Sequence, residues 1–194
     1  MVTSEVISEI AGQLQKSPSR SIRYLQEHGY IVRVLRGVFY VKSATERETG
    51  VLDRSVFEIV AESLNLKGVR NWYIALETAL RVNELTHEYF AVNFVMTDGY
   101  RTTKAIRILD TKFWFLRRSK EQFSFGVERR FDLKFSDKEK TVLDLVHKRY
   151  IDTKDERLAV APYLEHRDGL DNQKILRYVK NYPRRIQIIV GGVV

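Results

Sequence analysis

The sequence has no cysteine, only three prolines and ten glycines in 194 residues. Without cysteine the chain can form no disulfide, no thiolate nucleophile and no zinc site built on thiolates. No apolar run approaches about 18 residues, and the first residues are not a basic segment followed by an apolar core, so we expect neither a transmembrane helix nor a signal peptide. These absences predict a cytoplasmic protein with no membrane partner.

Positive charge is in excess along the chain. The formal net charge of +8 and the pI near 9.6 favour a polyanionic partner, nucleic acid first and an anionic membrane surface second. With 44% hydrophobic and 30% charged residues, the composition is that of an ordinary globular protein. The length suits one medium domain or two small ones.

The first forty residues have the pattern of two helices joined by a short turn. Apolar residues at i, i+3, i+4 and i+7 predict a first helix with a single apolar stripe, formed by Ile7, Ile10, Ala11 and Leu14. Ser17 then stands as an N-cap before Pro18, and Gly29 follows a second helix expected at residues 18–28. Ile22 and Leu25 of this helix are expected to face back onto the first.

A hairpin is expected next. Residues 30–34 and 38–41 are rich in β-branched and aromatic side chains, and residues 35–37 supply a turn that ends in Gly37. Between Lys16 and Lys42 there are six basic residues against Glu27 alone, a net charge of +5. Two helices, a tight turn, a hairpin and this charge predict a winged helix-turn-helix that binds DNA.

The second helix supplies most of the expected DNA contacts, because its polar and basic residues lie opposite Ile22 and Leu25. The residues predicted to bind DNA are Ser17, Ser19, Arg20, Arg23, Tyr24, Arg33, Arg36 and Lys42. The alternative is a helical hairpin whose arginines only solvate it. Such domains usually have one more helix before the pair, so we expect either that residues 53–64 supply it or that the module is minimal.

The remainder of the chain predicts a second domain. Residues 43–50 are polar and charged and are predicted to be a linker. Residues 51–194 are predicted to form the second domain. Helices are expected at 51–66, at 72–85, from a Ser136–Glu139 capping box onward, at 158–164 and at 171–182. Strands are expected at 90–97, 105–109, 113–116, 123–127, 130–135 and 186–190. The fold class is therefore α+β: an N-terminal winged helix-turn-helix, then a mixed α/β domain with a mostly antiparallel sheet.

Aromatic residues between 113 and 125 are flanked by Lys112, Arg117, Arg118 and Lys120. Such a surface can stack single-stranded bases. We favour the alternative, in which alternate aromatics fill the sheet core and the basic residues line its solvent face. That basic face can still extend a DNA footprint or meet an acidic partner.

Little in the sequence points to catalysis. The four histidines have no metal-ligand spacing, and there is no Gly-rich phosphate loop or Gly-x-Ser-x-Gly elbow. Asp110, Asp132 and Asp144 leave a metal-dependent nuclease as an alternative. We expect no enzyme activity, no metal and no cofactor.

Three segments together resemble a known family: LQEHGYIVRVLRGVFYV at 25–41, YIALETALRVNELT at 73–86 and FSDKEKTVLDLV at 135–146. The order resembles the AbiEi-type antitoxins of type IV toxin–antitoxin systems, also described as predicted transcriptional regulators of viral defence systems. The resemblance implies a winged helix-turn-helix that represses its own operon, and a second domain that counteracts a nucleotidyltransferase-like toxin. It also implies a structural or partner-facing role for Thr141 and Asp144.

The sequence thus predicts a regulator that binds double-stranded operator DNA, is a homodimer and has a possible cognate toxin. The strand expected at residues 186–190 is one candidate for the dimer contact. The alternative function is a DNA-binding regulator without a toxin, whose second domain serves dimerisation or ligand sensing.

Overall fold

The computed structural model describes residues 1–194, which divide into two compact units. The first unit consists of residues 1–70 and 106–111, and the second of residues 71–105 and 112–194. The elements of the first unit are β1 (Val2–Thr3), α1 (Ser4–Gln13), α2 (Pro18–Glu27), β2 (Ile31–Leu35), β3 (Val38–Val41), α3 (Ala44–Thr49), α4 (Val56–Leu66) and β6 (Ile106–Ile108). None of the chain's helices combines the length and the apolar character needed to cross a membrane.

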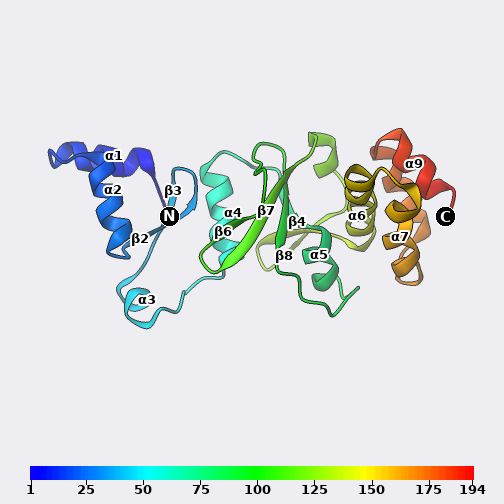
Figure 1. The fold of residues 1–194 in the computed structure, drawn as a ribbon, viewed down its shortest axis with the longest axis horizontal. Coiled ribbons are helices and arrows are strands. Elements are labelled where there is room, and N and C mark those ends of the chain that lie inside the picture. Colours follow the sequence, from blue (N-terminus) through cyan, green and yellow to red (C-terminus); the bar gives the residue numbers. More distant parts are fainter. The chain divides into compact units, whose positions relative to one another are not determined.

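An antiparallel sheet with the strand order β1-β3-β2 lies at the centre of the first unit. The pair α1 and α2 lies on one side of this sheet, and α4 packs against β2 and β3 on the other (Figure 1). Ile7, Ile31 and Phe39 form the small core under α1 and α2, where Ile22 and Leu25 also pack. The expected two helices and the hairpin after them are therefore confirmed.

Residues 43–50, expected to be a linker, form the helix α3. Ser43 accepts a hydrogen bond from the backbone N–H of Glu46, and the Glu46 side chain accepts one from the Ser43 N–H, which is a complete capping box. Gly50 ends the helix in the left-handed conformation, with φ of 71°. Local capping residues inside a polar sequence explain the difference, and the boundary between the compact units lies at residues 70–71 instead.

The second unit is built on a mixed sheet. Its main elements are β4 (Trp72–Ala75), α5 (Leu76–Val82), β5 (Asn93–Thr97), β7 (Thr111–Arg117), β8 (Val127–Arg130), β9 (Leu133–Ser136), α6 (Lys138–Thr153), α7 (Glu156–His166), α8 (Asn172–Tyr178) and α9 (Arg184–Gly191). Three short 3₁₀ turns are η1 (Lys120–Phe123), η2 (Arg167–Gly169) and η3 (Val179–Asn181).

The strand order in this unit is β7-β5-β4-β9-β8. β4 pairs antiparallel with β5, and β8 with β9, but β5 pairs parallel with β7, and β4 with β9. The expectation of a mostly antiparallel sheet is therefore corrected to a mixed one. The reason is connection length, because the chain after β5 is long enough to return to the same end of the sheet before β7 begins.

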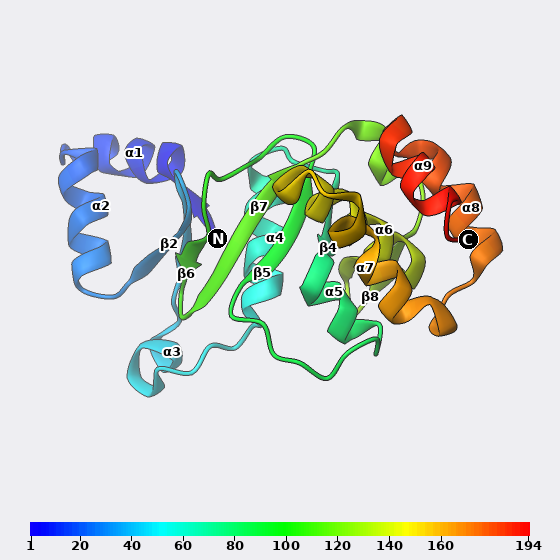
Figure 2. The same cartoon turned by 45° about the vertical axis from the view of Figure 1, so that its right-hand side comes forward.

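α6 is the central helix of the second unit. It lies between the sheet and a layer of three helices, α7, α8 and α9 (Figure 2). Val142, Leu143 and Val146 of α6 are fully buried in the cluster that includes Ile175 and Ile186 of the outer layer. Leu145, on another side of α6, joins the cluster formed by the sheet and α5.

Several expected elements of the second unit differ in the structure. Residues 72–85 begin as strand β4 and become helical only at Leu76, because residues 72–75 are buried in the middle of the sheet. Residues 186–190 belong to helix α9, in which Ile186, Ile189 and Val190 face the core at helical spacing. Residues 123–127, expected to be a strand, begin with the last residue of η1, Phe123, and enter β8 only at Val127.

Candidate nucleic-acid interface and the buried cluster of the second unit

Helix α2 begins and ends as its sequence predicts. Ser17 occupies the N-cap position in an extended conformation, and Pro18 is the first helical residue. The Ser17 side chain makes no capping bond and lies 3.2 Å from the Ser19 hydroxyl instead. At the other end Gly29 has φ of 71°, and the Tyr30 N–H donates to the Leu25 carbonyl at 2.9 Å. This left-handed glycine closes the helix and starts the hairpin.

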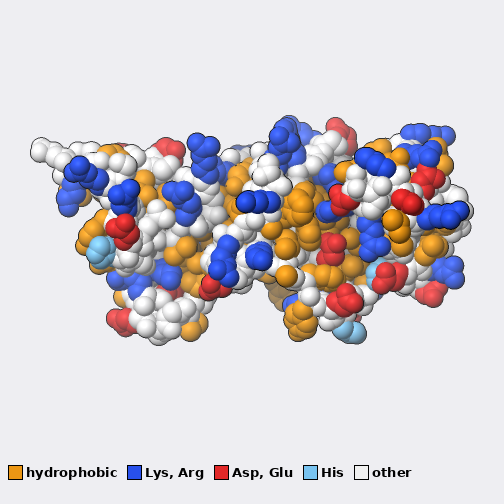
Figure 3. Space-filling view, in the orientation of Figure 1, with side chains coloured by type: hydrophobic (Ala, Val, Ile, Leu, Met, Phe, Trp, Pro, Cys, Tyr) orange, Lys and Arg blue, Asp and Glu red, His pale blue; other side chains and the backbone are white.

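The two sides of α2 differ as predicted. Ile22 and Leu25 pack against the core of Ile7, Ile31 and Phe39. The residues on the opposite side are exposed: Ser19, Arg20, Arg23, Tyr24 and Glu27. Figure 3 shows that Lys and Arg side chains, with few acidic ones, gather over α2 on this view of the molecule. We call Ser19, Arg20, Arg23 and Tyr24 the α2 face.

The orientation of Tyr24 is fixed by a neighbour that sequence reasoning passed over. The His28 ring stacks on the Tyr24 ring with the ring centroids 4.0 Å apart. His28 Nδ1 lies 2.9 Å from the Tyr24 carbonyl oxygen, which anchors the imidazole to the end of the helix. The i, i+4 spacing of two aromatic rings was the signal available in the sequence.

The hairpin places its basic residues at three different points. Arg33 lies on the edge strand β2, opposite Phe39, with its guanidinium 5.6 Å from the centre of that ring. Because Phe39 faces α1 and α2, Arg33 lies on the same face of the sheet, beside α2. Arg36 is exposed in the turn, next to Gly37, whose carbonyl accepts the Ser4 N–H at 2.9 Å. Lys42 is half-buried at the base of the hairpin, away from the turn.

The predicted apolar stripe on α1 is only half buried. Ile7 and Ala11 are in the core, but Ile10 and Leu14 are 50% and 61% exposed. They line an apolar groove of about 700 Å³ between α1 and α2, together with Tyr24. The candidate third helix, residues 53–64, packs on β2 and β3 as α4 and is not the cover of this groove.

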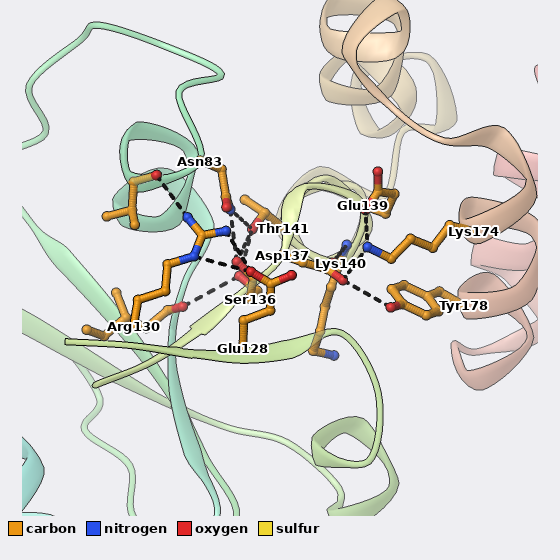
Figure 4. Close-up of polar contacts among 12 residues, drawn as sticks. Asn83, Glu128, Arg130, Ser136, Asp137, Glu139, Lys140, Thr141, Lys174 and Tyr178 are labelled. Carbon is orange, nitrogen blue, oxygen red and sulfur yellow. Dashed lines mark hydrogen bonds and ion pairs between the residues drawn. The ribbon is translucent and has the colours of Figure 1, made fainter. Parts of the chain in front are cut away.

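Thr141 and Asp144, which the family resemblance singled out, are fully buried on α6. The Thr141 hydroxyl lies 2.7 Å from the Ser136 hydroxyl and accepts a hydrogen bond from Asn83 Nδ2 at 3.1 Å (Figure 4). Ser136 is the last residue of β9 and does not cap α6. Asp137 caps α6 by accepting the Lys140 N–H, so the expected Ser136–Glu139 capping box is not formed.

The Asp144 carboxylate accepts hydrogen bonds from the hydroxyls of Tyr73 at 2.9 Å and Tyr182 at 2.8 Å. Burial raises the pKa of both tyrosines well above the ordinary value, and the adjacent carboxylate adds to the rise. The two hydroxyls remain protonated donors at neutral pH. Asp144 thus joins the sheet, α6 and the chain before α9.

Two lysines complete the cluster around α6. Lys140 is fully buried, with its ammonium 3.9 Å from the centre of the Phe125 ring and 3.4 Å from Gln122 Oε1. Burial lowers its pKa, although Asp144 and Asp137 favour its charge. Lys174 of α8 pairs with Asp137 at 2.9 Å and Glu139 at 2.8 Å (Figure 4). Burial disfavours its charge, but hydrogen bonds to Glu139 and Asp137 outweigh burial and raise the pKa of Lys174.

The carboxylates of the nuclease alternative do not converge. Asp144 is buried, whereas Asp132 is exposed in the turn after β8 and pairs with Arg129. Asp110 is exposed and belongs to the first unit. No group of three or more His, Asp or Glu side chains is arranged to hold a metal ion.

The aromatic residues of 113–125 mainly serve the core, as we favoured. Phe113 and Phe115 are fully buried, and Trp114, Phe123 and Phe125 are half-buried. Lys112, Arg117 and Lys120 are exposed.

The chain matches no protein-family model, and a search of curated proteins finds no similar sequence. Among solved structures, the fold is similar to the crystal structure of the RV2827C protein from Mycobacterium tuberculosis. The TM-score is 0.57 at 12% sequence identity, over 98% of this chain and 72% of that one. The similarity extends over both units and concerns the fold alone.

Proposed function

We propose that the protein is a DNA-binding transcriptional regulator that acts by binding and not by catalysis. The observation that carries the proposal is the orientation of α2, which buries Ile22 and Leu25 and presents Arg20 and Arg23 to solvent. In this proposal the first unit is a winged helix-turn-helix, α1 supports the recognition helix α2, and β2 and β3 form the wing.

The chemistry of the α2 face suits a major groove. Arginine side chains bind guanine O6 and N7 in a bidentate manner, and short hydroxyl side chains such as Ser19 reach phosphate or base edges. No residue of α2 is fully buried, so the helix stands at the surface of its unit. A recognition helix has to be accessible in this way to enter the groove.

The hairpin extends the interface in the proposal. Arg33 lies beside α2, and Arg36 lies at the exposed turn, where a wing contacts the DNA backbone. Lys42, half-buried at the base of the hairpin, supplies long-range positive potential more than direct contact. Ser17 lies at the N-terminus of α2, where its hydroxyl and nearby backbone N–H groups favour a phosphate.

A homodimer on double-stranded operator DNA follows from the small size of this interface. One recognition helix with few base-reading residues gives limited specificity, and two half-sites are the usual solution. The segment 186–190 is no candidate for a strand-mediated dimer contact, because it is helical and Ile186, Ile189 and Val190 are buried. Light scattering at tens of micromolar measures the oligomeric state, and a monomer at that concentration contradicts the dimer.

The resemblance to AbiEi-type antitoxins extends the proposal to autoregulation in the cytoplasm and to neutralisation of a nucleotidyltransferase-like toxin. Thr141 and Asp144 are then structural residues of the second unit, since both are fully buried. The alternative is a regulator without a toxin, whose second unit senses a ligand or dimerises. Co-expression with the product of an adjacent nucleotidyltransferase-like gene separates the two, because only an antitoxin restores growth.

Direct DNA binding tests the main proposal. Fluorescence anisotropy with the duplex upstream of the protein's own gene, against an unrelated duplex of equal length, should show tighter binding of the first. Lys67→Ala, at the exposed C-cap of α4, is the matched control for variants of the α2 face and the hairpin that lose one positive charge. Equal affinity for the two duplexes would remove operator recognition. Cleavage of either duplex in the presence of Mg²⁺ or Mn²⁺ would instead support the nuclease alternative.

A further inference from the structure

A cavity of about 740 Å³ opens in the second unit where the parallel strands β5 and β7 end. Asp98 follows β5 and Arg118 follows β7, and the Arg118 N–H donates to the Thr97 carbonyl at 2.8 Å, which holds the two strand ends together. In open α/β sheets, ligands bind in the crevice at the carboxyl ends of parallel strands. The cavity therefore lies at the edge of the sheet where ligands of such folds bind. Its volume is in the range of about 300–1,000 Å³ that is typical of small-molecule sites.

The rim of the cavity is strongly basic. Arg101, Arg117, Arg118 and Lys120 line it, against a single carboxylate, Asp98. The Asp98 side chain accepts a hydrogen bond from Asn71 Nδ2 at 2.8 Å, and the Asp98 carbonyl accepts one from Arg117 Nε at 3.1 Å. None of the salt bridges in the structure neutralises these four cations. Guanidinium groups bind phosphate oxygens in bidentate pairs, so three arginines around one cavity favour a phosphate-bearing ligand.

Two residues that line the cavity each have a buried nitrogen atom without a hydrogen-bond partner. Arg118 Nε and His147 Nδ1 are both inaccessible to solvent and without a hydrogen bond. Unpartnered buried polar atoms destabilise a fold, and each needs an explanation such as a missing ligand. Burial, and then the positive charge of Arg118, lower the pKa of His147 to about 4, so its ring is neutral at pH 7 and can donate one hydrogen bond to a bound oxygen.

The inner wall of the cavity is rigid. Tyr182 is buried and held by Asp144 at 2.8 Å. Gln122 accepts a long hydrogen bond from Lys140, and its amide donates to the Asn181 carbonyl, so both of its polar ends are used. The buried cluster around α6 thus fixes the wall against which a ligand would pack, and this rigidity reduces the entropy lost on binding.

We propose that this cavity binds a small ligand bearing a diphosphate or triphosphate group, such as a nucleotide. The phosphate oxygens lie among Arg117, Arg118 and Lys120, with Arg101 and His147 also in the lining. The remainder of the ligand packs against Tyr182 and Pro183. The site is separate from the α2 face, which belongs to the other unit, and does not depend on DNA binding by the first unit.

Isothermal titration of the full-length protein with pyrophosphate, ATP and adenosine tests the proposal at about 150 mM salt, where surface attraction is screened within about 8 Å. Pyrophosphate and ATP should bind with Kd below about 1 mM, and adenosine should not bind detectably. The variant Arg101→Gln with Lys120→Gln removes two exposed charges without disturbing the core, and it should weaken binding by about tenfold or more. Arg149→Gln with Arg177→Gln is the matched control, because both are exposed in the second unit but do not line the cavity.

A second readout reports on the buried nitrogen atoms of Arg118 and His147. The His147 ring resonances should shift on titration with pyrophosphate, and the other three histidines should not. Arg118→Gln should abolish binding, and if that variant fails to fold, the exposed double variant still decides. Absence of binding by both pyrophosphate and ATP at about 1 mM overturns the proposal. Equal weakening by the control pair also overturns it, as does binding of a 5′-phosphorylated oligonucleotide through the same residues in preference to ATP.

Discussion

The hydroxyl of Tyr40 on β3 donates a hydrogen bond to Oε1 of Glu46 on α3, and both side chains are buried. The same carboxylate accepts the backbone N–H groups of Ser43 at 2.8 Å and Asp53 at 2.9 Å. One buried carboxylate with three donors ties the segment after the hairpin to the hairpin itself. The polar stretch at 43–50 is therefore anchored to the first unit through Glu46, although its other residues are exposed.

Replacement of Glu46 by alanine should destabilise the first unit. It leaves the Tyr40 hydroxyl and two backbone N–H groups without their acceptor, at a cost of about 2–4 kcal/mol in the free energy of unfolding. Denaturant unfolding followed by circular dichroism measures the change. Glu48→Ala, an exposed change in the same short helix, should stay within about 0.5 kcal/mol. Similar values for the two variants would contradict the role given to Glu46.

The same residue predicts a pH dependence. Burial by itself would raise the pKa of Glu46, but hydrogen bonds from Tyr40, Ser43 and Asp53 outweigh it and hold the pKa below its ordinary value of 4.5. A depressed folded-state pKa gives stability that is present above the unfolded pKa and is lost as pH falls through the folded one. The parent protein should therefore lose more stability than Glu46→Gln when the pH falls below 4.5. Unfolding curves of both proteins at pH 7 and across this window measure it, and parallel losses would exclude Glu46 as the source.

A cut after Gly50 should yield an insoluble C-terminal fragment. Ile59, Val60 and Leu64 of α4 are buried, and α4 packs on β2 and β3, which such a fragment lacks. Apolar helix faces that become exposed in this way promote aggregation. A fragment that begins at Asn71 omits α4 and should be more soluble. Gel filtration compares the two, and a monodisperse fragment from Val51 would show that α4 does not need the hairpin.

Arg20→Ala and Arg23→Ala should each weaken binding to the specific duplex by about 1–3 kcal/mol and relax the preference at one base pair. Both side chains are exposed opposite Ile22 and Leu25, so the thermal midpoint should hardly change. Anisotropy against single-base-pair variants of the duplex measures both effects. Parent-like binding by both variants would remove α2 from the groove.

Arg36→Ala should act differently, because the turn of the hairpin is expected to contact phosphates. Binding to specific and unrelated duplexes should fall by the same factor, and the slope of log K against log salt should decrease by about one. A salt titration with both duplexes gives the slopes. A loss confined to the specific duplex would mean that Arg36 reads a base.

The sequence predicted best those elements whose boundaries are local. Ser17, Pro18 and Gly29 delimit α2 by themselves, and Gly37 makes the turn of the hairpin with φ of 76°. Residues 72–75 have a helical pattern in continuation with Leu76, but they pair with β5 and β9, strands about 20 and 60 residues farther along the chain. Such distant partners override local propensity. In 186–190, β-branched residues suggested a strand, although Ile186, Ile189 and Val190 also have helical spacing.

The same distinction applies to the sites. The direction of Arg20 and Arg23 could be predicted, because helical periodicity relates them to Ile22 and Leu25. The basic cavity could not, because its lining residues come from points between Asp98 and Pro183 and meet only through the parallel pairing of β5 and β7. The basic residues between Lys112 and Lys120 could be recognised in the sequence as a charged segment. The cavity could not be predicted from them.

The residues 106–111 belong to the first unit, although both flanking segments belong to the second. On the ribosome, the first unit therefore remains incomplete until residue 111 has emerged, by which time β4 and β5 of the second unit have also been made. The two units must then form in an overlapping order. The first unit cannot be moved into another protein as one continuous piece of gene without residues 71–105 of the second. A recombination event that preserves the first unit has to carry at least the span from residue 1 to residue 111.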